Sequence, residues 1–166
     1  QLTARNNPVI WKNFLIAYGA SAKPGAYGIS KRVNQAAQFF PQDQEIKNMQ
    51  KLYVIGQDKI NESNSIAGEA LNFYDSRRYI EAAEKFIEAG EINFVEYSHF
   101  ENAASAYFLA GDYGQAFLYV NKVIEQFNPM TGKAEYLKAL ININWGDSQS
   151  ACELLNTSIS YGYTQA

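Results

Sequence analysis

A segment near the middle of the chain nearly repeats itself at one fixed offset along the sequence. Tyr79-Ile80-Glu81-Ala82 is followed, at an offset of 34, by Tyr113-Gly114-Gln115-Ala116. The flanking positions agree at the same offset and pair Ala70 with Ala104, Phe73 with Tyr107, and Phe86 with Val120. A fixed period of this length is typical of stacked helical hairpins, whose extended faces usually serve binding.

Apolar residues at helical spacing predict six helices after residue 63, paired as three hairpins. We expect them at about residues 64–75, 79–91, 95–110, 113–127, 133–145 and 148–160, with Asn64 or Ser65 capping the first. Gly111-Asp112 and Asn128-Pro129 should end two of them. The last cycle runs at an offset of 35, and in it Asn142 stands where the earlier units carry Phe73 and Tyr107.

Residues 1–62 are less regular than the rest of the chain. Pro8 opens a predicted helix that carries Trp11, Phe14, Leu15 and Tyr18. Residues 19–28 read as a loop, and a second helical stripe then runs to Pro41 through Ile29, Val33, Ala36, Ala37 and Phe40. A third helix is expected at about residues 43–60, and it has no evident partner helix. No low-complexity linker divides the chain, which indicates one continuous array.

Composition and charge exclude several classes of function. The net charge of the 166 residues is −3, which is too small to favour nucleic acid as a partner. The charge is uneven, because residues 1–42 hold five basic residues and no acidic residue. No apolar run approaches the length of about 18 residues that a membrane-spanning helix needs.

The residues that carry chemistry in other proteins form no catalytic constellation here. His99 is the only histidine, and we expect it at the surface or in a contact between hairpins. Cys152 is the only cysteine, and we expect it to pack rather than react. The run Glu81, Glu84, Glu88 and Glu91 should be a solvated face. The sequence therefore predicts a protein that is not an enzyme and needs no metal or other cofactor.

Residues 97–130 resemble a tetratricopeptide repeat. The pattern of that family is carried by Phe100, Ala104, Tyr107, Gly111-Asp112-Tyr113, Ala116, Val120, Val123 and Pro129. Residues 63–96 match nearly as well, although Arg77 replaces the glycine of the turn and Glu69 stands where the family prefers leucine. Residues 131–164 match moderately, and residues 8–41 match loosely. The resemblance implies an all-α, right-handed α-α superhelix of about nine helices, with a divergent hairpin and an extra helix in residues 1–62.

The resemblance also implies a concave groove lined by the first helix of each hairpin. We name its implied members the groove set: Asn64, Ala67, Leu71, Tyr74, Asp75, Ser98, Glu101, Asn102, Ser105, Phe108, Leu109, Lys133, Tyr136, Leu140 and Ile143. One subclass of the family holds a C-terminal carboxylate with a clamp of Lys, Arg and Asn, and at those positions this chain has Ala67, Leu71, Glu101 and Ser105, which do not supply it. An extended peptide or a helix of another protein fits such a groove better.

The function expected from this resemblance is that of a protein-binding scaffold or adaptor. Two alternatives remain open: a non-catalytic domain of a larger glycosyltransferase or peptidase, and a dedicated secretion chaperone. Neither end shows a polar capping face, so we expect either a longer array or self-association through the ends. The start at Gln1 and the many Asn, Gln and Tyr residues resemble exported bacterial envelope proteins.

Overall fold

The computed structural model describes residues 7–21 and 27–164, and every regular element in these residues is helical. They contain nine α-helices and two short π-helical segments and no strand, so the expected all-α class is confirmed for the described part of the chain. The helices separate into two compact units, residues 1–62 and residues 63–166, and each unit is described by itself. No described helix combines the length and the apolar character needed to cross a bilayer.

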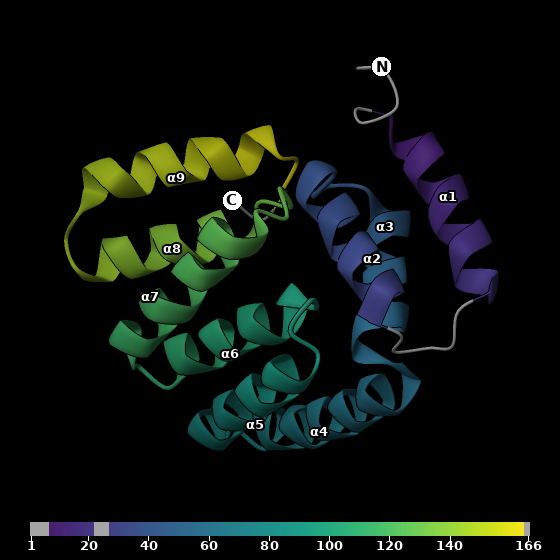
Figure 1. Ribbon diagram of the computed structural model, residues 1–166. Helices are drawn as coiled ribbons and strands as arrows, with labels where there is room; N and C mark the ends of the chain where they lie inside the picture. The colour runs from purple at the N-terminus through teal and green to yellow at the C-terminus, as the bar shows by residue number, and fades with distance from the viewer. Residues whose placement is uncertain (1–6, 22–26, 165–166) are drawn as a thin grey trace. The chain divides into compact units, whose positions relative to one another are not determined.

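Unit 1 is built from three helices around a small core. The helices are α1 (Pro8–Ser21), α2 (Tyr27–Phe39) and α3 (Gln44–Gln50), followed by the π-helical segment η1 (Lys51–Ile55) (Figure 1). Leu15, Ile29, Val33, Ala36 and Ile46 are fully buried between them. Because Ile46 belongs to this core and α3 packs on α2, the expectation of an unpaired third helix is wrong.

The junction after α3 also differs from the sequence-based expectation. The chain breaks at Gly56, where φ is +88°, and α4 (Gln57–Asp75) starts at once. Asn64 and Ser65 therefore lie inside a helix and do not cap one. The expected loop at residues 19–28 is shorter, because α1 continues to Ser21 and α2 begins at Tyr27. The rest of that loop, residues 22–26, lies outside the described residues.

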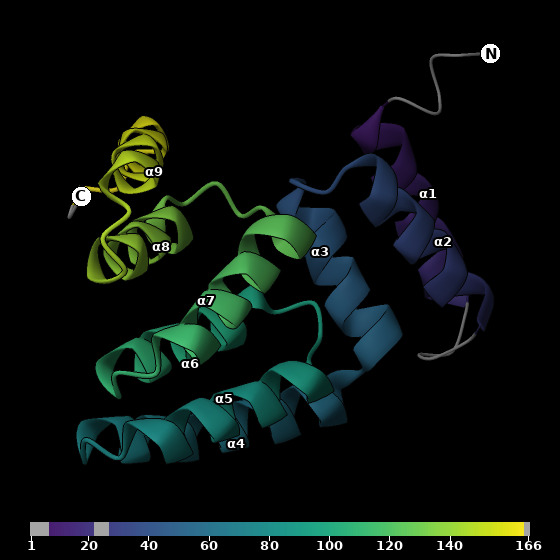
Figure 2. The ribbon, with the colours of Figure 1, turned by 90° about the vertical axis from the view of Figure 1, so that its left-hand side faces the viewer.

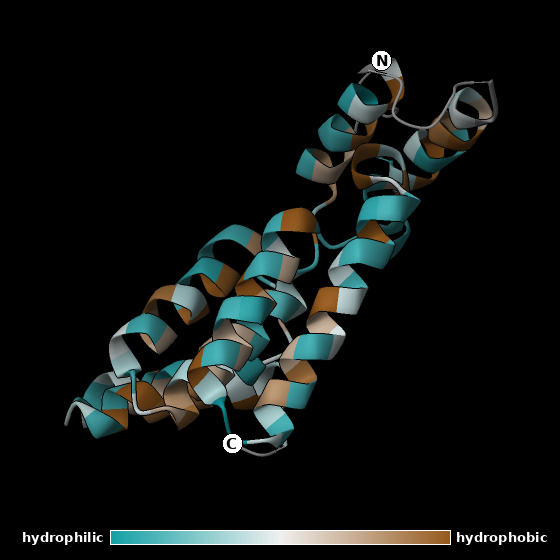
Figure 3. Ribbon diagram, turned by 90° about the horizontal axis from the view of Figure 1, so that it is seen from below, coloured by the Kyte–Doolittle hydropathy of each residue, from teal (hydrophilic) through white to brown (hydrophobic). Residues whose placement is uncertain are grey.

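Unit 2 consists of consecutive helical hairpins. After the part of α4 that begins at Ser63 come α5 (Tyr79–Ile92), α6 (Tyr97–Leu109), α7 (Tyr113–Lys122), the π-helical segment η2 (Val123–Phe127), α8 (Lys133–Asn144) and α9 (Ser148–Ser160). From α5 onward each helix packs on the next, as Figures 1 and 2 show. The helices carry both hydrophobic and hydrophilic residues (Figure 3), and buried residues of α4 to α8 form one hydrophobic core.

Small residues bring neighbouring helices of unit 2 close together. Ala104 on α6 and Ala116 on α7 have no exposed surface, as their place in the repeat predicts. Gly90 on α5 faces the ring of Phe100 on α6, and a Cβ atom at position 90 would lie 2.7 Å from that ring. Helix–helix contact at these points therefore depends on the absence of a larger side chain.

The three tight turns of unit 2 share one backbone conformation. Arg77, Gly111 and Gly146 occupy the same place in their hairpins, with φ values of +60°, +79° and +82°. Asp112 and Asp147 follow the two glycines and cap α7 and α9, since each carboxylate accepts a hydrogen bond from a backbone N–H in the first turn. The hairpin period of the sequence thus appears directly in the backbone.

Candidate functional site

The groove set lies on α4, α6 and α8, the first helices of the three hairpins of unit 2. Three of its four large aliphatic members, Leu71, Leu109 and Ile143, are each about half exposed, and the fourth, Leu140, is partly buried. Tyr74 and Phe108 are partly buried, because one side of each ring packs on the core of the unit. The first helices therefore carry apolar side chains that the fold covers only in part.

Two aromatic pairs occupy equivalent places in two successive hairpins. The rings of Tyr74 and Tyr79 lie 5.4 Å apart, and in the next hairpin the rings of Phe108 and Tyr113 also lie 5.4 Å apart. Each pair joins the end of the first helix of a hairpin to the start of the second, across the tight turn. The rings of the first pair meet edge-on and those of the second are tilted to each other, and these contacts hold the rings in place.

One ion pair joins the first helices of two neighbouring hairpins. Nζ of Lys133 on α8 lies 3.0 Å from Oε2 of Glu101 on α6 and 3.4 Å from Oδ1 of Asn102. Glu101 is only 5 % exposed, and its second oxygen, Oε1, has no hydrogen-bond partner among the described residues. Burial, followed by the negative charges of Glu101 and Glu96, raises the pKa of Tyr97 in the preceding turn. A carboxylate in this place favours cations and hydrogen-bond donors nearby.

Glu101 is the one buried member of the groove set. The resemblance implies a place in the groove for it, but the fold buries it, with Nζ of Lys133 on α8 beside its carboxylate. Ser98 and Ser105 are likewise engaged, with Ser98 donating to Glu96 and Ser105 donating to the carbonyl of Glu101. Glu101 can therefore act on a ligand only through its charge or through a movement of Lys133.

His99 joins three helices. It is almost fully buried on α6, and its Nε2 atom lies 3.1 Å from the hydroxyl of Ser63 on α4. That hydroxyl also donates to the carbonyl of Ala89 on α5. His99 thus lies in a contact between hairpins, which is one of the two positions expected for it, and not at the surface.

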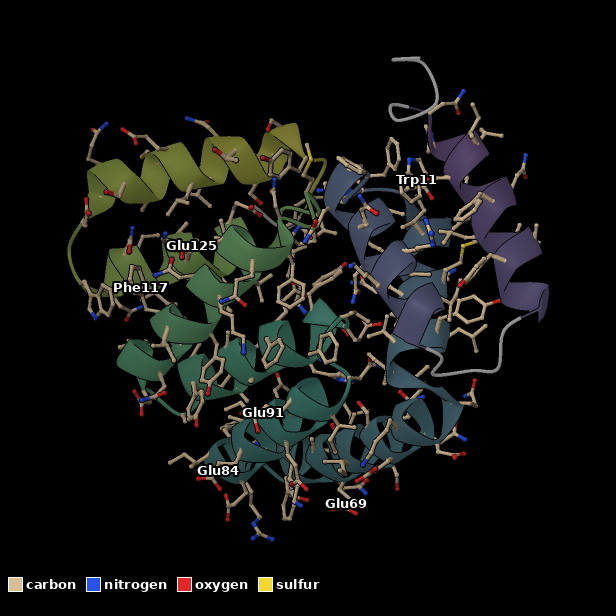
Figure 4. The ribbon with its side chains drawn as sticks, in the orientation of Figure 1. Trp11, Glu69, Glu84, Glu91, Phe117 and Glu125 are labelled. Atoms are coloured by element: carbon tan, nitrogen blue, oxygen red, sulfur yellow. The ribbon has the colours of Figure 1, made fainter. Side chains whose placement is uncertain are left out.

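Cys152 and the acidic run can also be placed. Cys152 on α9 is exposed, so the expectation that it packs is wrong. The acidic side chains of α5 are a solvated face as expected, and Lys85 bridges Glu88 of that helix and Glu69 of α4 at 2.8 Å and 3.7 Å (Figure 4 labels Glu69, Glu84 and Glu91). The described residues contain no group of three or more His, Cys, Asp and Glu side chains that could hold a metal ion.

No model of a known protein family matches this chain, and no curated protein matches it.

Sequence reasoning missed one hollow of unit 2, which we name the Asn142 pocket. It has a volume of about 550 Å³, and its walls come from α7, α8, α9 and the turn between the last two: Phe117, Lys138, Asn142, Trp145, Asp147, Ser150, Glu153, Leu154 and Thr157. Phe117 lies on α7 beside α8 (Figure 4), with its ring 4.9 Å from that of Trp145. The signal that could have revealed the pocket is Asn142 itself, a small polar residue at a position that is aromatic in the two earlier hairpins.

Both ends of the described chain carry apolar side chains on their outer faces. Val9, Ile10 and Ile16 of α1 are about half exposed, as is Ile159 of α9. Self-association through these faces stays a prediction.

Proposed function

We propose that this protein is a scaffold or adaptor whose α4, α6 and α8 helices line a concave groove that holds a segment of another protein. In this proposal the hairpins of unit 2 are tetratricopeptide-like repeats that form a right-handed solenoid, and the bound segment is an extended peptide or a helix. The observation that carries the proposal is the recurrence, from one hairpin to the next, of half-covered aromatic side chains on the first helices.

The physical basis is the character of this face. A partner segment would cover the exposed halves of Leu71, Leu109 and Ile143 and would meet the rings of Tyr74 and Phe108, which are already held by their neighbours. Rings that are fixed before binding lose little entropy on binding, so they favour affinity. Aromatic anchors at the centre of an interface often contribute about 2 kcal/mol or more when truncated.

Affinity capture with matched variants tests the proposal. The double variant Tyr74→Ala, Phe108→Ala removes the two anchors, and the loss of each should weaken the binding of the partner by about 2 kcal/mol. The control is Ile80→Ala, Leu118→Ala, which removes exposed apolar side chains from the second helices α5 and α7. We expect proteins identified by mass spectrometry with the wild type to remain on the control variant and to be lost from the first variant.

Circular dichroism must show that both variants keep their helix content, because Tyr74 and Phe108 also touch the core. Partners that stay on the Tyr74→Ala, Phe108→Ala variant and leave the control variant would overturn the proposal and move the binding site to the second helices.

A further inference from the structure

The Asn142 pocket occupies the space that an aromatic side chain fills one hairpin earlier. Asn142 corresponds to Tyr107 at an offset of 35, and at that same offset Asp147 and Leu154 of the pocket wall correspond to Asp112 and Tyr119. Tyr107 is only 9 % exposed, and its ring stacks on that of Tyr119 with the centroids 5.9 Å apart. The pocket is therefore the position of Tyr107 with the aromatic ring removed.

The walls of the pocket suit a flat ring. Phe117 and Trp145 line the pocket with their ring centroids 4.9 Å apart, and Trp145 is half exposed. Leu154 of α9 also lines the space. Nζ of Lys138 lies 5.2 Å from the centre of the Phe117 ring, which is within the range of a cation–π contact.

The pocket also contains a polar group that the fold does not use. Asn142 is 7 % exposed and lines the pocket, and its side-chain amide makes no hydrogen bond within the described part of the chain. An amide that is largely removed from water and has no partner in the protein gains from a ligand that supplies one. This amide can both donate and accept, so it suits a hydroxyl group.

We propose that the Asn142 pocket binds a tyrosine side chain of a partner protein. The phenol ring takes the place that Tyr107 takes in the preceding hairpin, against Phe117 and Trp145, and its hydroxyl exchanges a hydrogen bond with the amide of Asn142. Phenylalanine would fill the same space but would leave the amide unpartnered, and that difference selects tyrosine. The site uses α7, α8 and α9 and is separate from the groove set, so it extends the proposed function.

The experiment compares two capped tripeptides, Gly-Tyr-Gly and Gly-Phe-Gly, by NMR titration of the isotope-labelled full chain. We expect the tyrosine peptide to shift the amide signals of residues 117, 142 and 145 in a saturable way at millimolar concentration. The phenylalanine peptide should bind about fivefold to tenfold more weakly, since it lacks the hydrogen bond. Equal binding of the two peptides would overturn the assignment to tyrosine, and the absence of saturable shifts at these residues would overturn the site.

Two variants complete the test. Asn142→Tyr restores the aromatic residue of the repeat, so it should fill the pocket, abolish peptide binding and raise the melting temperature. Trp145→Ala removes a half-exposed wall of the pocket and should weaken binding without loss of helix content. Unchanged peptide binding in both variants, or shifts that move to Tyr74, Phe108 and Tyr136, would overturn the proposal.

Discussion

The ammonium group of Lys133 lies 3.0 Å from a carboxylate oxygen of Glu101, and this contact joins α8 to α6. Glu101 is buried while Lys133 is about one-third exposed, so the two partners are not equivalent. Removal of the lysine leaves a charged group in the interior without its counterion, whereas removal of both charges leaves no such group. Substitutions of these two residues therefore measure how strongly the neighbouring hairpins are coupled.

The first prediction uses this asymmetry. Lys133→Ala should lower the free energy of unfolding by about 1–3 kcal/mol, because the carboxylate of Glu101 loses its counterion. The double variant Lys133→Ala, Glu101→Gln should regain part of that loss, since a neutral amide is less costly to bury than a charge. Urea unfolding followed by circular dichroism measures both. With Glu101→Gln measured as the second single variant, a double variant as unstable as the sum of the two single changes would show that the two side chains are not coupled.

The second prediction concerns the contact between α6 and α7. Ala104 has no exposed surface, so Ala104→Leu should overpack the contact and destabilise the protein by about 1–3 kcal/mol. Ala110→Leu is the matched control, because Ala110 lies exposed at the end of the same helix. Thermal melts of the two variants should differ clearly. Equal melting temperatures would contradict the close approach of these helices.

The third prediction concerns the turn residues. Arg77 adopts a left-handed conformation with φ of +60°, which costs a residue with a Cβ atom roughly 1 kcal/mol. Arg77→Gly should therefore stabilise the protein, by less than about 1 kcal/mol because glycine loses more backbone entropy on folding. Gly111→Ala should destabilise the protein. Because a Cβ atom at position 111 meets nothing within 4 Å, that loss of stability comes from the backbone conformation alone.

Chemical denaturation of Arg77→Gly and Gly111→Ala measures whether each variant is more or less stable than the wild type. Stability changes of the same sign in the two variants would show that the turns are not equivalent, although their φ values agree.

The fourth prediction concerns pH. The hydrogen bond from the Ser150 hydroxyl, followed by that from the Ser150 backbone N–H, holds the pKa of the Asp147 carboxyl below its ordinary value of 3.8. A carboxyl group whose pKa is lower in the folded state stabilises the fold above the ordinary value. That stabilisation is lost as the pH falls through the lowered pKa.

Thermal melts between about pH 5 and pH 2 test this prediction, with Asp147→Asn as the control that keeps an acceptor but does not titrate. The stability difference between wild type and variant should shrink as the pH falls. A constant difference over the whole range would show that the charge of Asp147 makes no contribution at the start of α9.

Several elements were predictable because they depend on local patterns. Five of the six helices after residue 63 appear near their predicted bounds, and 148–160 agrees at both ends, whereas α4 begins at Gln57 rather than at about residue 64. Helical spacing of apolar residues and the turn signals Gly111-Asp112 and Gly146-Asp147 act within a few residues, so a single chain reveals them. The burial of Ala104 and Ala116 follows from the same repeat.

Near the start of the chain the local signal was ambiguous. The apolar pattern of residues 43–60 runs through η1 and Gly56 without a visible break, and the backbone conformation alone separates α3 from α4. The partner of α3 is α2, which ends only a few residues before it. No spacing rule states that Ile46 rather than another residue of α3 completes the core around Leu15 and Val33.

The sequence by itself determined the helical class, the hairpin period after residue 63 and the small residues at the helix crossings, because each depends on neighbours along the chain. Tertiary packing decided the rest. It buried Glu101 beneath Lys133, joined His99 to Ser63, left Cys152 exposed, and opened a pocket at Asn142. These features depend on distances between helices that are far apart in sequence, and the physical reason is that exposure and pairing are properties of the packed helices rather than of a residue type.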